Sequence, residues 1–200
     1  MRKILVRWLA KVAAKFRCKS DTLHMCVQLI DLMLLDHGAT FNKKNFQLLG
    51  VSCLFISCKY NEIYSMEACK YVEVCEGIYT VGEIFEMEGF VLGALNFNLQ
   101  IPTAHQFSSH ILNSSRMPKQ HCYIVKTLLD MSIFDFETFN TLRKNDMAIG
   151  IIYFVAKLYQ LEEVKANLSP FKNRINSEDL KKCFNVAANL FKKSQIATTH

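Results

Sequence analysis

The sequence has few residues that interrupt helices, with seven Gly and three Pro among 200 residues and no Pro before Pro102. Tight β-turns depend on Gly and Pro, so their scarcity argues against a turn-rich β fold and favours helices. No apolar run approaches the ~20 residues of a membrane-spanning helix, and we expect no membrane segment. The basic N-terminus continues directly into a helical pattern without a small-residue cleavage site, so we interpret it as part of the fold.

Motifs of catalysis and metal binding are missing as well. The eight Cys form no CxxC pair, and the six His fall in no HExxH or Cys/His metal spacing. The sequence contains no P-loop, no G-x-G-x-x-G and no G-x-S-x-G motif. We therefore expect no enzymatic activity, no cofactor and no metal. Several Cys lie within apolar helical patterns, which indicates reduced thiols and a cytosolic or nuclear protein.

The composition is that of a folded soluble protein, with 50% hydrophobic and 21% charged residues, and the length allows one or two domains. The net charge of +6 is unevenly distributed. Seven Lys or Arg and no acid occur between Arg2 and Lys19, whereas seven Glu and one Lys occur between Glu62 and Glu88. The first half thus has a basic start and an acidic middle.

Apolar residues recur at helical spacing along most of the chain. In the first half this pattern predicts five helices, over 2–16, from Ser20 or Asp21 to before Gly38, and over 45–60, 66–76 and 80–95. The helix over 45–60 is apolar nearly all round, so we expect it to be central and buried. Ser20 or Asp21 suits an N-cap, and Thr80 with Glu83 forms a capping-box pattern.

A break over 96–102 predicts a linker, and about five further helices follow it. Four are expected over 103–112, 119–134, 145–159 and 177–193, and a short one between 167 and 174. The two halves share no alignable repeat, but the pattern is compatible with a repeated architecture.

Short motifs stand in a fixed order along the first half: MRKILVRWL (1–9), TLH (22–24), ID (30–31), QLLGV (47–51), SCKYNEIY (57–64), ME (87–88) and LNFNL (95–99). In this order and spacing they resemble the cyclin box of A/B-type cyclins. The second half resembles the C-terminal box of that family more loosely, chiefly from Pro102 to Phe107.

The resemblance implies an all-α fold of two tandem five-helix cyclin-box bundles, over residues 1–99 and 100–200. It implies a regulatory subunit that binds and activates a cyclin-dependent protein kinase and thereby controls cell-cycle progression and mitosis. The first bundle would bind the kinase and also substrate or inhibitor docking peptides. The nucleus and the cytoplasm are the expected locations.

Lys59 and Glu88 match the signature Lys and Glu of the family, which the resemblance places together on the kinase-facing surface. An ammonium donates and a carboxylate accepts hydrogen bonds, so the two can satisfy main-chain groups of one segment near the αC helix of a kinase. An ordinary intramolecular ion pair is the alternative. The remaining residues expected in this interface are Ile56, Tyr60, Glu62, Leu92, Phe97 and Leu99.

The resemblance also implies a docking groove between the first helix and the start of the third, with core packing as the alternative. Its expected residues are Met1, Ile4, Leu5, Trp8, Lys11, Lys43 and Gln47. Arg2 and Asp31 match an ion pair that braces the box in this family.

The charge of the first helix departs from the family. Arg7 and Lys11 stand where the family usually carries acids that receive an Arg of the docking peptide, and they continue a basic row from Lys3 to Lys15 at i, i+4 spacing. Either this row is a solvated face, or the groove prefers less basic, acidic or phosphorylated ligands. Asn61, Ser65-Met66 and Leu32 also depart from the family, which indicates a divergent member.

A cyclin-box protein of the transcription-factor type is the main rival, because basic residues on the first helix could contact DNA phosphates. The acidic stretch from Glu62 to Glu88 opposes phosphate binding, and the Lys59/Glu88 match belongs to kinase binders. We therefore do not expect a nucleic-acid partner.

Overall fold

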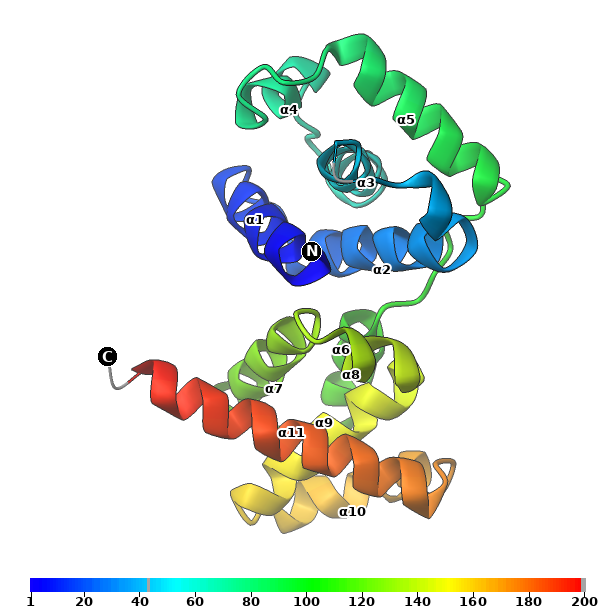
Figure 1. The fold of residues 1–200 in the computed structure, drawn as a ribbon. Coiled ribbons are helices and arrows are strands. Elements are labelled where there is room, and N and C mark those ends of the chain that lie inside the picture. Colours follow the sequence, from blue (N-terminus) through cyan, green and yellow to red (C-terminus); the bar gives the residue numbers. More distant parts are fainter. Residues whose placement is uncertain (43, 199–200) are drawn as a thin grey trace. The chain divides into compact units, whose positions relative to one another are not determined.

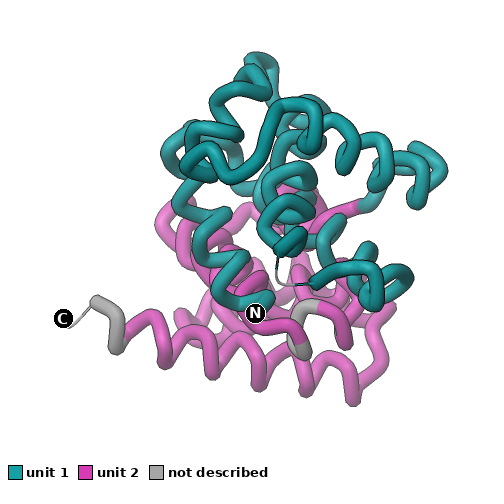
Figure 2. Tube along the Cα trace, turned by 45° about the horizontal axis from the view of Figure 1, so that its top comes forward, with its two compact units in different colours: residues 1–101 teal, residues 102–200 magenta. Residues whose placement is uncertain are grey.

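The computed structural model describes residues 1–42 and 44–198, with the side chains of 137–139 and 196–198 left aside. All regular elements in this part of the chain are helices, so the all-α prediction is confirmed. The chain divides into two compact units, Met1–Ile101 and Pro102–His200, coloured teal and magenta in Figure 2.

Unit 1 contains five α-helices and a short 3₁₀ helix, and Figure 1 shows α3 enclosed by the other four α-helices. Contacts join α3 to α1, α2, α4 and α5. The elements are α1 (Arg2–Lys15), α2 (Ser20–His37), η1 (Gly38–Thr40), α3 (Phe46–Asn61), α4 (Ala68–Val74) and α5 (Val81–Ala94).

The central position of α3 follows from its sequence. All eleven residues from Leu48 to Cys58 are buried, so this helix presents apolar surface in every direction, as predicted for the helix over 45–60. Only its ends reach solvent: Phe46 and Gln47 are half-buried at the start, and Lys59 and Tyr60 are exposed at the end. These two ends are where the predicted groove and the predicted interface lie.

The start of α2 differs from the prediction of an N-cap at Ser20 or Asp21. Lys19 occupies the N-cap position and makes no side-chain cap. Instead, the Glu62 carboxylate, which follows α3, accepts hydrogen bonds from the Lys19 backbone N–H at 2.7 Å and from the Thr22 hydroxyl. A carboxylate at a helix N-terminus also complements the helix dipole, so Glu62 caps α2 from 40 residues away in sequence.

The start of α5 is as predicted. The Thr80 hydroxyl accepts from the Glu83 N–H at 3.2 Å, and the Glu83 carboxylate accepts from the Thr80 N–H at 2.8 Å. Both halves of a capping box are therefore present.

Unit 2 is built around α9, whose residues from Asp146 to Ile152 are all buried. Helix α9 contacts α6, α7, α10 and α11, so each unit packs around one apolar helix. The elements are α6 (Ala104–Ser115), α7 (Lys119–Ser132), α8 (Phe136–Thr141), α9 (Lys144–Leu158), α10 (Glu162–Lys172) and α11 (Ser177–Thr198).

Two elements of unit 2 differ from the prediction. The short helix α8 was not predicted, because six residues are too few to establish a helical period. Helix α10 begins at Glu162, well before residue 167, and includes Pro170 two residues before its end. Its first turn carries Glu162 and Glu163, which favour a helix N-terminus.

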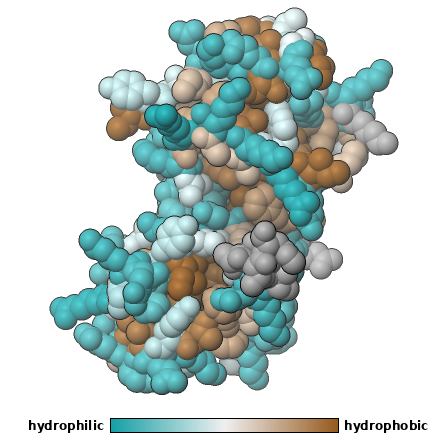
Figure 3. All heavy atoms as spheres, turned by 90° about the vertical axis from the view of Figure 1, so that its left-hand side faces the viewer, coloured by the Kyte–Doolittle hydropathy of each residue, from teal (hydrophilic) through white to brown (hydrophobic). Residues whose placement is uncertain are grey.

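Apolar side chains also reach the surface. On the face drawn in Figure 3 they form separate groups among hydrophilic residues. In unit 1 the most exposed large ones include Met1, Ile4, Ile63, Tyr64 and Phe97, with 69%, 74%, 84%, 91% and 72% of their surface accessible. Such groups indicate places where a partner can bury apolar area.

Candidate functional site

Lys59 and Glu88 form an ion pair that joins the last turn of α3 to the middle of α5. The Lys59 side chain is 44% exposed and that of Glu88 is 12% exposed, so the pair lies at the surface with its carboxylate partly enclosed. An ammonium has three N–H donors, and Glu88 takes only part of this capacity. The pair can therefore offer both a donor and an acceptor to an approaching segment.

One aromatic side chain contacts this pair and a second packs against the first, and sequence reasoning did not single them out. The Lys59 ammonium lies 4.3 Å from the centroid of the Phe55 ring, a cation–π arrangement. Phe55 in turn contacts Phe85 of α5, with ring centroids 6.0 Å apart. Phe55 precedes Lys59 by four residues and Phe85 precedes Glu88 by three, so helical spacing places each ring on the same face as its charged neighbour, but only the packing of α3 on α5 brings the two rings together.

The apolar residues predicted around this pair divide into two groups. Tyr60 and Phe97 are exposed, and Leu92 and Leu99 are half-buried, so these four can contribute apolar area to a contact. Ile56 is only 2% exposed and belongs to the core of unit 1, because α3 is covered on every side at this level. Ile56 therefore supports the surface from below and does not line it.

Glu62 was expected in the kinase interface, but its side chain turns towards α2. Its side chain is only 13% exposed and binds the N-terminus of α2. The carboxylate is therefore engaged within unit 1, and its role here is to fix the end of α3 against α2. The place of Glu62 in the sequence, three residues after Lys59, gave no indication of this contact with α2.

Phe97 projects from a strained turn at the end of α5. Asn96 and Phe97 have φ angles of +49° and +57°, in the left-handed region that bulky residues rarely adopt. The Phe97 N–H donates to the Leu92 carbonyl at 2.8 Å and the Asn96 N–H to the Gly93 carbonyl at 3.0 Å, which holds the turn. The 72% exposed Phe97 ring is thus fixed at the surface, and strain of this kind is often found at functional sites.

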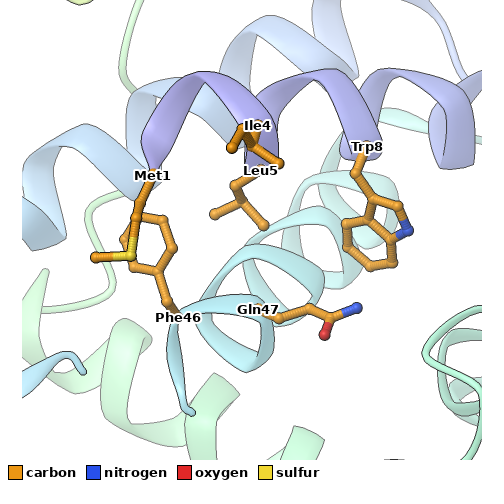
Figure 4. Close-up of a pocket in the computed structure, with 6 residues that line it drawn as sticks. All are labelled: Met1, Ile4, Leu5, Trp8, Phe46 and Gln47. Carbon is orange, nitrogen blue, oxygen red and sulfur yellow. The ribbon is translucent and has the colours of Figure 1, made fainter. Parts of the chain in front are cut away.

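A groove of about 320 Å³ lies between α1 and the start of α3. Figure 4 shows Met1 and Phe46 at one end, Trp8 at the other, and Leu5 pointing from α1 to α3. The structure thus brings together all of the predicted lining residues that it describes apart from Lys11, and it adds Phe46. The lining residues are Met1, Ile4, Leu5, Trp8, Phe46 and Gln47.

The floor of the groove depends on Gly50. A Cβ placed on Gly50 would lie 2.8 Å from Leu5 Cδ1, so the absence of a side chain there lets Leu5 settle onto α3. Leu5 is 6% exposed, whereas Ile4 beside it is 74% exposed. Leu5 is therefore a core residue, as the core-packing alternative holds, whereas the side chains of Met1 and Ile4 are accessible to a ligand. Lys11 is exposed on α1, and Lys43 lies outside the described residues.

Arg2 and Asp31 form a bidentate ion pair that fixes α1 to α2. Arg2 Nε donates to Asp31 Oδ1 at 2.6 Å, and the second nitrogen donates to Oδ2 at 2.8 Å. The Asp31 side chain is 2% exposed and that of Arg2 is 10% exposed, so this pair is nearly removed from solvent. Because Arg2 lies between Met1 and Ile4 in sequence, the pair also orients the start of the groove.

The described residues contain no group of three or more His, Cys, Asp or Glu side chains that could hold a metal ion. Among these residues, no helix combines the length and the apolar character required to cross a membrane.

A family model described as the N-terminal domain of cyclins matches residues 1–100. The G2/mitotic-specific cyclin-B1 of Carassius auratus is 34% identical over 137 residues, and that of Oryzias javanicus is 36% identical over 137 residues. Each alignment covers 68% of this chain and 34% of the relative. Cyclin-A1-2 of Arabidopsis thaliana is 34% identical over 146 residues, which cover 68% of this chain and 33% of the relative. The chain thus spans about a third of the length of these relatives.

Solved structures show the same fold over nearly the whole chain. A viral cyclin from herpesvirus saimiri has a TM-score of 0.68 at 17% identity, covering 94% of this chain and 85% of that one. A chain of the CAK complex of Chaetomium thermophilum bound to ATP-γ-S has a TM-score of 0.62 at 11% identity, covering 94% and 59%. The match of the cyclin N-terminal domain to half of the sequence shows the family: this chain belongs to the cyclins.

Proposed function

We propose that the chain is a regulatory subunit that binds a cyclin-dependent protein kinase through unit 1 and raises its activity. The observation that carries this proposal is the Lys59–Glu88 pair, placed at the exposed junction of α3 and α5 in a chain of the cyclin family. The kinase-binding surface, as we define it, consists of Lys59, Glu88, Tyr60, Leu92, Phe97 and Leu99.

The chemistry of this surface suits a partner helix with an open end. Lys59 can donate to backbone carbonyls that a helix leaves unpaired at its C-terminus, and Glu88 can accept from nearby N–H groups. Each charge keeps the other as a counter-ion, which lowers the cost of removing either from water when the surface is covered. Tyr60 and Phe97 add exposed aromatic area, the kind of residue that most often dominates binding energy.

Binding would activate the kinase by selecting one position of its αC helix. In an active kinase a Glu of αC pairs with a Lys of strand β3, and this pair positions the ATP phosphates. A rigid surface that binds αC only in that position shifts the kinase population toward the active state. The rigidity comes from unit 1, where α3 is held by all four neighbouring helices and by the cap that Glu62 makes on α2.

One solved structure of this fold is part of such an assembly. The Chaetomium thermophilum chain of the same fold belongs to a complex that binds ATP-γ-S.

The test is a direct binding measurement of the purified chain against a panel of cyclin-dependent kinases, followed by turnover assays on the kinase that binds. We expect Lys59→Ala and Glu88→Ala each to weaken binding by about 2–5 kcal/mol, because each leaves its partner unpaired in a covered interface. Kinase turnover at saturating unmutated chain should rise well above that of the kinase alone.

A matched control is Lys70→Ala, which breaks a Lys–Glu pair on α4 whose side chains are 50% and 58% exposed. This change should leave kinase affinity within about 0.5 kcal/mol of the original. If Lys59→Ala and Lys70→Ala had the same small effect, the Lys59–Glu88 pair would be an ordinary surface pair and the proposal would fail.

A further inference from the structure

The groove between α1 and α3 presents apolar surface that this chain does not cover. Met1 and Ile4 on its rim are 69% and 74% exposed, and Trp8, Phe46 and Gln47 are half-buried. Figure 4 shows these side chains around the opening, with Leu5 pointing from α1 towards α3. An open concave site of this kind gains free energy when a ligand brings apolar side chains into it.

The helices that form the groove carry charge of one sign only. Neither α1 nor α3 contains an Asp or Glu, whereas α1 contains Arg2, Lys3, Arg7, Lys11 and Lys15. Arg2 is used by Asp31. The other four are exposed, and within the described residues none of them has an ion-pair partner.

The cations stand next to the groove and not on the far side of α1. Arg7 follows Ile4 by three residues, and Lys11 follows Trp8 by three, which places each one turn along the same face of the helix. Lys15 continues the row four residues after Lys11. A peptide lying in the groove and extending along α1 would therefore meet Arg7 first, then Lys11 and Lys15.

We propose that this groove binds an acidic peptide segment, with apolar side chains seated between α1 and α3 and Asp or Glu side chains paired with Arg7, Lys11 and Lys15. The charge of α1 would repel a segment rich in Lys or Arg. The site lies at the opposite end of α3 from Lys59, so the inference goes beyond the proposed kinase binding and does not depend on it.

The spacing of the cations favours carboxylates over a single phosphate. Side chains one helical turn apart are about 5–6 Å from each other at Cβ, so the positive charge is spread along α1 and not gathered at one point. Positive charge distributed along α1 in this way can pair with several Asp or Glu side chains of a peptide, one for each cation. The phosphates of duplex DNA could pair with the cations, but DNA has no apolar side chains to cover Ile4 and Met1. A peptide can contact both the apolar groove and the basic row.

The experiment uses the full chain and fluorescent peptides of about twelve residues, in which two Leu are followed by acidic, neutral or basic side chains. The Glu peptide should bind roughly tenfold more tightly than its Gln counterpart, and the Lys peptide should bind most weakly. The difference between the Glu and Gln peptides should shrink when salt rises from about 50 mM to about 300 mM, since exposed charges are screened.

Reversing the charge of the site should reverse its preference. Arg7→Glu/Lys11→Glu changes two exposed side chains and leaves the apolar lining intact, so the Lys peptide should now bind more tightly than the Glu peptide. The control Lys181→Glu/Lys192→Glu makes the same change of charge on exposed positions of α11 and should keep the original order. Ile4→Ala should weaken all peptides about equally, because it removes apolar contact without changing charge.

Three outcomes would overturn the inference. The first is a Lys peptide that binds the unmutated chain as tightly as the Glu peptide. The second is a peptide with phosphoserine at the acidic positions that binds while the Glu peptide does not, which would identify a phosphate site. The third is duplex DNA that binds more tightly than the Glu peptide and is unaffected by Ile4→Ala, which would identify the basic row as a nucleic-acid contact.

Discussion

Gly150 of α9 lies directly against Cys183 of α11, and a Cβ placed on Gly150 would be only 2.3 Å from the Cβ of Cys183. The atom in conflict is the first of the Cys183 side chain, so no rotation of that side chain relieves it. Helices α9 and α11 can approach this closely only because position 150 has no side chain. This contact therefore sets the distance between the central helix of unit 2 and its longest helix.

Replacing Gly150 should destabilise unit 2. We expect Gly150→Ala to lower the free energy of unfolding by about 1–3 kcal/mol, since added volume in a packed core forces backbone shifts. Urea unfolding followed by circular dichroism measures this change. The control is Gly93→Ala in α5, where a Cβ meets nothing within 4 Å and better helix propensity should stabilise slightly. Cys183→Ala should not rescue Gly150→Ala, because the conflicting Cβ remains.

The Arg2–Asp31 pair should be essential to unit 1 because it is nearly buried. Arg2→Ala is expected to cost about 3–5 kcal/mol, since it leaves the Asp31 carboxylate without its counter-ion in an enclosed site. Asp31→Asn should cost less, because the amide oxygen can still accept one hydrogen bond. Unfolding free energies of both single variants and the double variant give the coupling between the two residues. A loss below about 1 kcal/mol for Arg2→Ala, as expected of surface pairs, would contradict this prediction.

Cys18 and Cys58 should form a disulfide on mild oxidation, because their Sγ atoms lie 3.4 Å apart. The hydrogen bond with the Cys18 sulfur lowers the pKa of the Cys58 thiol, which favours the reactive thiolate. With diamide as oxidant, two thiols lose two protons and two electrons to the azo group while one S–S bond forms. Mass spectrometry of the unreduced digest should find the Cys18–Cys58 linked peptide, and Cys18→Ser should abolish it. Linked peptides that all involve the exposed Cys69 would contradict the prediction.

Alkaline pH should destabilise the chain through its buried thiols. Burial raises the pKa of Cys26 and Cys53 well above the usual range, so in the folded state these thiols keep their protons. In the unfolded state they lose them above about pH 8.5. The unfolded state then binds fewer protons, and the free energy of unfolding falls as pH rises. Urea unfolding at several pH values should show this slope, and Cys53→Ala should reduce it.

Most of the fold follows from residues that are close in sequence. The apolar period indicated the helices of unit 1 to within about two residues at most ends, and the Thr80/Glu83 box marked the start of α5 correctly. Two of the wrong predictions involve a long-range contact or a short element, whereas the predicted start of α10 was simply placed too late in the sequence. The cap of α2 comes from Glu62, which no local pattern around Ser20 could reveal, and α8 has too few residues to show a period.

The candidate site shows the same division. The pairs Lys59–Glu88 and Arg2–Asp31 were inferred from the resemblance to a family, and both contacts occur in the structure. The supports of these pairs depend on three-dimensional packing. Phe55 beneath Lys59 and Phe46 in the groove are apolar residues of an apolar helix, and sequence alone did not distinguish them from core. Ile56 shows the converse, since a position expected at the surface is covered by neighbouring helices.

The buried course of α3 has a mechanical consequence. Gln47 borders the groove and Lys59 borders the kinase-binding surface, and at 1.5 Å per residue the twelve steps between them span about 18 Å. Because neighbouring helices pack against α3 along this length, the distance between the groove and the kinase-binding surface is fixed. A peptide bound in the groove would therefore lie at a fixed distance from a partner bound at Lys59. Under the two proposals above, the number of residues between the peptide segment in the groove and the residue that a bound kinase modifies would decide which substrates can be modified.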